Sequence, residues 1–235
     1  QGATVIMACR SPERGEQARS QVAEQTGNPK VHLMLVDMSS LESIRSFAAA
    51  FKERFNRLDA LVNNAAHFDI SQKEPAYTPE GAETVFATNH LGPFLLTNLL
   101  LDTLKATTSS RIINISSQGL MMHPFMKIDF DDLSVSKNRK FKVSHAYYHS
   151  KLAHVMFTRE LARRLEGTGV TCNAVRVPNV RIDTSRYPDL PKIALWAYDI
   201  KQRFAITPEE MGAVYSKLAT APEYESLSGA YIDEK

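Results

Sequence analysis

The chain has 235 residues, a length at which an α/β protein is commonly a single domain with one core. Its 28 basic and 26 acidic residues give a net charge of +2, which offers no reason to expect nucleic acid as a partner. No apolar run approaches the roughly 20 residues that a membrane-spanning helix needs. No targeting sequence precedes the first predicted strand, so we expect a cytoplasmic protein. Cys9 and Cys172 lie in apolar runs and are expected to be free thiols.

Hydrophobic patterns predict an alternation of strands and helices along the whole chain. The strands are expected at 4–9, 31–36, 58–62, 111–115, 170–175 and 229–232. The helices are expected at 12–25, 40–55, 79–104, 146–165 and 207–220. Gly92-Pro93 should kink the third helix. This order predicts one Rossmann-like domain over residues 1–235, with a doubly wound, mostly parallel sheet and helices on both faces.

Tyr147 and Lys151 are four residues apart at the start of the predicted 146–165 helix, so they share one face of it. A nearby ammonium group favours phenolate and should lower the tyrosine pKa from about 10 toward neutrality. Such a phenol can donate or accept a proton near pH 7. A Tyr/Lys pair at this spacing also occurs by chance on solvated helices, so the pair alone is weak evidence for a site.

Polar residues gather where the predicted strands end. They are Arg10, Asp37, Asn63-Asn64, Ser116-Ser117 and Pro178-Asn179. Each could be an ordinary turn or capping residue. The carboxyl ends of parallel strands form the ligand-binding edge of such sheets, however, and five polar positions at one edge favour a site.

The order and spacing of several short motifs resemble the short-chain dehydrogenase/reductase family, in particular its retinol-dehydrogenase-like branch, over residues 2–232. The motifs are Ala8-Cys9-Arg10, Val36-Asp37-Met38, Asn63-Asn64-Ala65-Ala66, Thr88-Asn89-His90-Leu91-Gly92, Asn114-Ile115-Ser116-Ser117, Tyr147-Tyr148-His149-Ser150-Lys151 and Leu227-Ser228-Gly229. The resemblance implies an enzyme that transfers a hydride between a nicotinamide cofactor and a carbonyl or alcohol.

Within this resemblance, four residues take catalytic roles. Tyr147 would exchange the proton, Lys151 would lower its pKa and bind the nicotinamide ribose, Ser117 would hold the substrate oxygen, and Asn89 would support a water chain behind Lys151. The family's spacing of tyrosine and lysine fits Tyr147 and not Tyr148.

The resemblance also implies a set of cofactor-binding residues. Asp37 and Met38 would lie beside the adenine, Asn64, Ala65 and Ala66 would line the adenosine side, and Pro178 would contact the cofactor with Tyr147 and Lys151. After the first predicted strand, the chain has Arg10 and no carboxylate before Glu13. Because a guanidinium suits a phosphate, NADP(H) is the expected cofactor.

The sequence departs from the family in three places. The family's first strand and glycine-rich phosphate turn have no counterpart here; that strand would lie between the 4–9 and 58–62 strands. Its loss would leave unpaired backbone groups that cost roughly 1–3 kcal/mol each. We therefore expect the sequence to be part of a longer protein. The Asn63-Asn64-Ala65-Ala66 motif has alanine where glycine is usual, and Asn179 also replaces a usual glycine. Asp183-Thr184 leaves the register after Pro178 open.

The sequence thus favours an NADP(H)-dependent oxidoreductase acting on a lipophilic carbonyl/alcohol pair. The alternative is a noncatalytic binding module of the same fold. A homodimer through the 79–104 and 146–165 helices is possible. His145 and His149 are spaced like metal ligands but lack a third, so no metal site is expected. Trp196, Tyr187, Tyr198 and Phe204 could form a substrate lid or pack a short helix.

Overall fold

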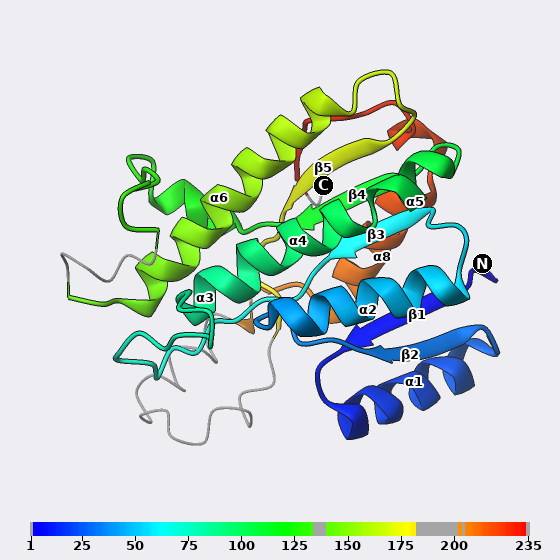
Figure 1. The fold of residues 1–235 in the computed structure, drawn as a ribbon, viewed down its shortest axis with the longest axis horizontal. Helices are drawn as coiled ribbons and strands as arrows, with labels where there is room; N and C mark the ends of the chain where they lie inside the picture. Colours follow the sequence, from blue (N-terminus) through cyan, green and yellow to red (C-terminus); the bar gives the residue numbers. More distant parts are fainter. Residues whose placement is uncertain (1, 134–139, 182–201, 204, 234–235) are drawn as a thin grey trace.

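The computed structural model describes residues 2–133, 140–181, 202–203 and 205–233, and within them strands and helices alternate as predicted (Figure 1). The strands are β1 (Val5–Cys9), β2 (Val31–Leu35), β3 (Ala60–Asn63), β4 (Arg111–Ile115), β5 (Thr171–Arg176) and β6 (Tyr231–Asp233). The main helices are α1 (Pro12–Thr26), α2 (Leu41–Arg54), α4 (Gly92–Leu99), α5 (Leu101–Ala106), α6 (Val143–Arg164) and α8 (Pro208–Thr220). All described strand pairs are parallel, and the Rossmann-like fold class is confirmed.

The sheet is interrupted at one place. β1 pairs with β2, and β3, β4, β5 and β6 follow one another in a second, four-stranded part. Figure 1 shows β1 on the side of β2 that is nearer to β3. The interruption therefore falls where the family resemblance places its additional strand. Val5 and Val62, which are 39% and 37% exposed, lie on the strands that border it.

One hydrophobic core spans this interruption and holds the two parts of the sheet together. It is centred on Ile44, Phe47 and Phe51 of α2 and on Leu96 and Leu100 from the α4 region. Ile6 of β1 and Leu61 of β3 both pack against it. Figure 1 shows α2, α4 and α6 along one face of the sheet and α8 on the opposite face.

The helix expected at 79–104 begins later and is less regular than predicted. Gly81 has a φ of 81° and closes a turn in which Thr78 N–H donates to Ala82 O. The buried Glu83 carboxylate then accepts hydrogen bonds from the N–H groups of Val85 and Phe86, which fixes the start of α3 (Thr84–Phe86). The prediction of a start at Pro79 was wrong because this turn and cap occupy 78–83.

The expected irregularity at Gly92-Pro93 is present as a change of helix type. Ala87–Leu91 form a π-helical turn, and α4 starts at Gly92. Pro93 lacks the N–H that would bond back into a regular helix, which favours the wider turn. A Cβ on Gly92 would lie 2.3 Å from the carbonyl oxygen of Met38. The absence of a side chain at Gly92 therefore lets the π-helical turn approach the end of β2.

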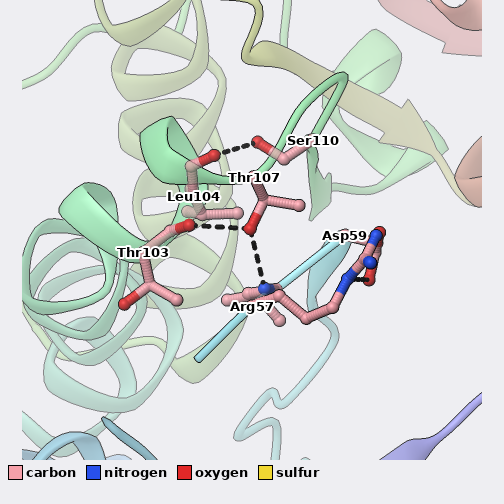
Figure 2. A network of polar contacts seen from close by, with 7 residues as sticks. Arg57, Asp59, Thr103, Leu104, Thr107 and Ser110 are labelled. Atoms are coloured by element: carbon pink, nitrogen blue, oxygen red, sulfur yellow. Dashed lines mark hydrogen bonds and ion pairs between the residues drawn. The ribbon is translucent and has the colours of Figure 1, made fainter. Parts of the chain in front are cut away.

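A polar junction ends α5 and starts two strands (Figure 2). The Thr107 hydroxyl donates to Thr103 O at 2.8 Å and accepts from Leu58 N–H at 3.0 Å. The Ser110 hydroxyl donates to Leu104 O at 2.8 Å. These bonds satisfy backbone groups at the helix end and fix the chain just before β3 and β4, whose other ends carry the candidate site.

Candidate active site

Three of the four predicted catalytic side chains come together at the carboxyl end of β4. Ser117 follows that strand and caps the 3₁₀ helix Gln118–Met122, its hydroxyl accepting from Gly119 N–H at 3.2 Å. Tyr147 and Lys151 lie one turn apart on α6, with the Lys151 amine 5.7 Å from the centre of the Tyr147 ring. The fourth, Asn89, is on the π-helical turn beside α6. The fold thus joins segments more than 60 residues apart in the sequence.

Ser117 and Tyr147 line the same cavity, which has a volume of about 700 Å³. Its other walls are mostly apolar and come from five segments of the chain. They comprise Ala66, Phe68, Ile70, Gln118, Gly119, Met121, Met122, Tyr148, Val177, Pro178, Asn179, Val180, Gln202 and Ala205. Phe68 packs on Tyr147 with ring centres 4.6 Å apart. A hydroxyl and a phenol in an apolar cavity of this size suit a small molecule with one reactive oxygen.

The ionisation of Tyr147 differs from the sequence-based expectation. Burial raises the pKa of Tyr147 to about 12, and the hydrogen bond with the Ser117 side chain offsets this only in part. The expected lowering by Lys151 is wrong for this arrangement, because the Lys151 amine donates to Ile115 O at 2.7 Å. Tyr147 is therefore protonated at pH 7, the form that can donate a proton.

Lys151 is unusual for a lysine in being only 2% exposed. Burial lowers its pKa to about 8, so the amine is still mostly charged at pH 7 but close to its titration range. A buried cation next to a phenol can stabilise the phenolate that remains after Tyr147 gives up its proton. The pair thus places a buried cation beside the phenol that would transfer the proton.

Asn89 uses its side chain to connect the π-helical turn with two other segments. Its Oδ1 accepts from His67 N–H at 2.6 Å, and its Nδ2 donates to His67 O at 3.1 Å and to Ser150 Oγ at 3.1 Å. Ser150 is the residue before Lys151 on α6. Asn89 therefore ties the loop after β3 to the helix that carries Tyr147 and Lys151.

The predicted cofactor residues lie at the ends of neighbouring strands. Arg10 follows β1 and is exposed, and Asp37 follows β2. Burial raises the pKa of Asp37, but hydrogen bonds from Ser39 and the nearby Arg10 guanidinium outweigh it, and the net shift is downward. The Asp37 carboxylate accepts from Ser39 N–H and Ser39 Oγ at 2.9 and 2.6 Å. Arg10 and Asp37 thus place a positive and a negative side chain near each other at this edge of the sheet.

The remaining cofactor candidates follow β2, β3 and β5. Asn64, Ala65 and Ala66 are exposed after β3, and Ala66 lines the cavity together with Pro178. Among the described non-glycine residues, Ser109 alone has a positive φ, so neither the alanines after Asn64 nor Asn179 adopts a backbone conformation that needs glycine. Met38 packs against the α2–α4 core. Asp183, Thr184 and the proposed lid residues Tyr187, Trp196, Tyr198 and Phe204 lie outside the described residues.

Sequence reasoning missed the close contact between Gly119 and Tyr148. A Cβ on Gly119 would lie 2.4 Å from the Tyr148 ring, so the ring rests directly on the glycine backbone. His123 and Tyr147 flank that ring, with centres 4.5 and 5.2 Å away. Tyr148 is thereby held as a wall of the cavity beside Tyr147. The adjacent tyrosines were visible in the sequence, but the partner glycine was not.

A buried polar chain beneath the site was also missed. Asn63 Nδ2 donates to Thr97 Oγ1 at 3.0 Å and to Asn114 Oδ1 at 2.8 Å, and Asn114 Nδ2 donates to Thr158 Oγ1 at 2.9 Å. These bonds link α4, β3, β4 and α6. Buried amides that are hydrogen-bonded in this way fix the relative positions of the elements that carry the site.

The histidines near α6 act as packing residues in the described structure. His149 is buried against the Phe86 ring, with centres 5.6 Å apart, and His154 packs near Phe157. Burial lowers the pKa of His154 well below its usual value, which keeps it neutral. The described part of the chain contains no group of three or more His, Cys, Asp or Glu side chains placed to hold a metal ion. Cys9 and Cys172 are both free thiols, as predicted.

Comparison with known proteins places this arrangement in a family. The family model for short chain dehydrogenases matches residues 1–128. Human retinol dehydrogenase 13 is 42% identical over 236 residues, a match that covers 99% of this chain and 69% of that protein. Human retinol dehydrogenase 14 is 37% identical over 247 residues, covering 99% and 71% respectively. The chain belongs to the short chain dehydrogenase family.

A solved structure of the family supports the fold assignment. A short chain dehydrogenase of Escherichia coli CFT073, crystallised with NADPH, superimposes with a TM-score of 0.73. The two proteins are 21% identical, and the match covers all of this chain and 87% of that one. The predicted family, oxidoreductase class and retinol-dehydrogenase-like branch are confirmed by these matches. Short chain dehydrogenases use NAD or NADP.

The expectation of a cytoplasmic protein is wrong. It rested on the missing targeting sequence, whereas the similar retinol dehydrogenases 11 to 14 are membrane-associated microsomal enzymes. Of the helices in the described residues, none has both the length and the apolar character needed to cross a membrane.

Proposed function

We propose that this short chain dehydrogenase is an NADP(H)-dependent oxidoreductase that interconverts a carbonyl and an alcohol on a lipophilic small molecule. The observation that carries the proposal is the shared cavity of Ser117 and Tyr147, with the buried Lys151 amine behind the phenol. A hydroxyl and a protonated phenol can bind the same substrate oxygen from two sides. The mostly apolar walls of the cavity limit the contact of that oxygen with water.

In the reducing direction, Ser117 would donate a hydrogen bond to the substrate carbonyl and orient it toward Tyr147. Tyr147 would then give its proton to the oxygen as negative charge develops there. Lys151 would stabilise the phenolate left behind, and Asn89 would keep α6 in place through Ser150. The high pKa of Tyr147 makes it a proton donor at pH 7, which favours carbonyl reduction as the direction to test first.

The donor set at the strand ends fits the adenosine and nicotinamide parts of a nicotinamide dinucleotide, while the described residues offer no glycine-rich turn for its pyrophosphate. Arg10 offers an exposed guanidinium for a ribose phosphate, and Asp37 and Met38 would lie beside the adenine. Asn64, Ala65 and Ala66 would line the adenosine side, and Pro178, Tyr147 and Lys151 would contact the nicotinamide half. When bound, the cofactor supplies or accepts the hydride. Among the family's solved structures, the E. coli protein was crystallised with NADPH.

The substrate class follows from the cavity walls. Phe68, Ile70, Met121, Met122 and Val180 provide apolar surface around Ser117 and Tyr147. Methionine and aromatic side chains adapt to long hydrocarbon groups and offer few hydrogen bonds. The similar retinol dehydrogenases are named for a lipophilic alcohol, so a retinoid alcohol or aldehyde is the first substrate to try.

The proposal is tested by titrating the purified protein with NADPH and following cofactor fluorescence, then adding all-trans-retinal and following its conversion to retinol by chromatography. We expect saturable NADPH binding and turnover of retinal well above that of a short polar aldehyde such as glyceraldehyde. A well-folded protein that binds no NADPH would contradict the enzyme proposal and favour a noncatalytic binding module. NADPH binding with faster turnover of glyceraldehyde would contradict the lipophilic substrate.

Arg10 should determine the preference between the two dinucleotides. We expect Arg10→Ala to raise the Kd for NADPH by about tenfold or more, because it removes a charge-assisted contact to the 2′-phosphate, and to leave the Kd for NADH within about twofold. Fluorescence titration with each cofactor measures both values without turnover. Arg14→Ala, an exposed arginine one helical turn further along α1, is the matched control. Equal losses for NADPH and NADH would rule out the assigned contact.

A further inference from the structure

The peptide group that joins Ser117 to Gln118 is held from two sides. The Tyr231 hydroxyl donates to the carbonyl oxygen of Ser117 at 2.9 Å. At the opposite edge of the same peptide group, Gln118 N–H donates to Val177 O at 2.8 Å. The orientation of this peptide relative to the rest of Ser117 is given by ψ of Ser117, which is 135°. Two hydrogen bonds that hold the peptide therefore also restrain the orientation of Ser117 at the end of β4.

Tyr231 is itself anchored in the sheet. Tyr231 begins β6 and pairs with Ala174 of β5, where Ala174 N–H donates to Ala230 O at 2.9 Å. Arg176 and Asp233 form an ion pair between the same two strands. Tyr231 OH also lies 3.5 Å from Ser116 Oγ, so its phenol reaches across β5 to the end of β4. A side chain anchored by a paired strand is a firm support for a catalytic group.

We propose that Tyr231 is a positioning residue: through the Ser117 carbonyl, it sets the orientation in which the Ser117 hydroxyl meets the substrate oxygen. The inference rests on the proposed function, because only that function gives Ser117 a substrate oxygen to bind. It assigns a role in the reaction to the last described strand, which contributes no side chain to the cavity wall. A small misplacement of a group that orients substrate can cost up to about 100-fold in rate.

If Tyr231 only stabilised the fold, removal of its hydroxyl would lower the unfolding temperature. The Ser117 carbonyl also accepts from Leu120 N–H at 3.2 Å, so it keeps a partner when the tyrosine hydroxyl is removed. Tyr231 is 41% exposed, and its ring would remain in Tyr231→Phe. The variant should therefore unfold at nearly the same temperature as the wild type. What changes is one bond that restrains the serine.

The test is a double-mutant cycle of Tyr231→Phe and Ser117→Ala, with kcat/KM for retinal reduction and Kd for NADPH measured on all four proteins. We expect Tyr231→Phe alone to lower kcat/KM by about tenfold, with the Kd for NADPH unchanged. In the Ser117→Ala background, where no serine hydroxyl remains to be positioned, it should lower kcat/KM by less than about twofold. Tyr77→Phe removes the hydroxyl of a similarly exposed tyrosine outside the cavity lining and should have no effect.

Each other result decides against the inference. If Tyr231→Phe lowers kcat/KM by the same factor in both backgrounds, or not at all, Tyr231 does not act through Ser117. If Ser117→Ala alone leaves kcat/KM unchanged, the role of the serine in the proposed function fails, and Tyr231 has no group to position. If Ser117→Ala lowers kcat/KM but its effect is independent of Tyr231→Phe, the proposed function stands and only this inference is wrong.

Discussion

A Tyr147→Phe variant is expected to lose about 10²- to 10⁴-fold in kcat for carbonyl reduction, the range that positioned proton donors contribute. The phenol shares a cavity with Ser117, and burial keeps it protonated at pH 7 by raising its pKa to about 12. Phenylalanine keeps the ring and its packing on Phe68 while removing the proton donor. The Kd for NADPH, measured by fluorescence, should change by only a few fold, which separates the loss of chemistry from a loss of cofactor binding.

The neighbouring tyrosine provides the matched control. Tyr148 also lines the cavity, with its ring packed on Gly119 and beside His123. Tyr148→Phe keeps this wall and should retain kcat within about threefold. The two variants differ by one position on the same turn of α6. If Tyr148→Phe is the inactive variant and Tyr147→Phe remains active, the assignment of the proton donor to Tyr147 is wrong.

Local sequence signals predicted the fold well. Where a helix start is fixed by adjacent capping residues, the expected cap is present: Ser11 accepts from Arg14 N–H before α1, and Thr207 with Glu210 forms a capping box before α8. The positions of the parallel strands could also be predicted, because strands buried on both faces appear as continuous apolar runs. The strand ends, and with them the approximate place of the site, followed from the alternation.

Contacts between distant segments could not be predicted in the same way. No property of Gly92 in the sequence indicates that its backbone lies against the carbonyl of Met38, 54 positions earlier, since its φ of −61° is that of any helical residue. Likewise Gly119 became interpretable only when the Tyr148 ring was seen to rest on it. Glu83 would have been an ordinary second-turn residue in a helix starting at Pro79, and its role as a cap depends on the preceding turn.

The electrostatic expectation failed for a related reason. The spacing of Tyr147 and Lys151 correctly predicted that they share a helix face, but a pKa depends on burial and on where the charged atom points. The lysine amine is directed to Ile115 O, and burial raises the pKa of Tyr147 more than the hydrogen bond with Ser117 lowers it. Side-chain direction and burial are properties of the folded chain, and sequence spacing does not contain them.

Lys151→Met is expected to abolish most carbonyl reduction while making the protein more stable at pH 7. Wild-type Lys151 carries its charge in a buried position, where its pKa falls from 10.5 to about 8. That difference of about 2.5 units corresponds to a cost of roughly 3 kcal/mol for the charged form in the folded state. Methionine fills a similar volume without charge. The variant leaves Ile115 O without its donor, which costs about 1–3 kcal/mol, so the net gain at pH 7 is about 0–2 kcal/mol.

The stability difference between the wild type and Lys151→Met should depend on pH. The folded-state pKa of Lys151 lies below the unfolded value, so between about pH 8 and 10.5 the unfolded chain binds more protons than the folded protein. The free energy of unfolding of the wild type therefore rises across this window, whereas Lys151→Met has no such contribution. The advantage of the variant at pH 7 should shrink above pH 8. It should be reversed near pH 10.5, where the neutral amine still donates to Ile115 O.

Urea unfolding of both proteins at pH 7, 9 and 10.5, followed by tryptophan fluorescence and circular dichroism, measures the difference directly, because other titrating groups are shared and cancel. Lys105→Met, at an exposed lysine of α5, is the control and should differ from the wild type by the same amount at every pH. A Lys151→Met difference that stays constant from pH 7 to 10.5 would show that burial of the charge does not govern this lysine. The predicted reversal, together with lost turnover, would show that the site keeps a destabilising cation because proton transfer needs it.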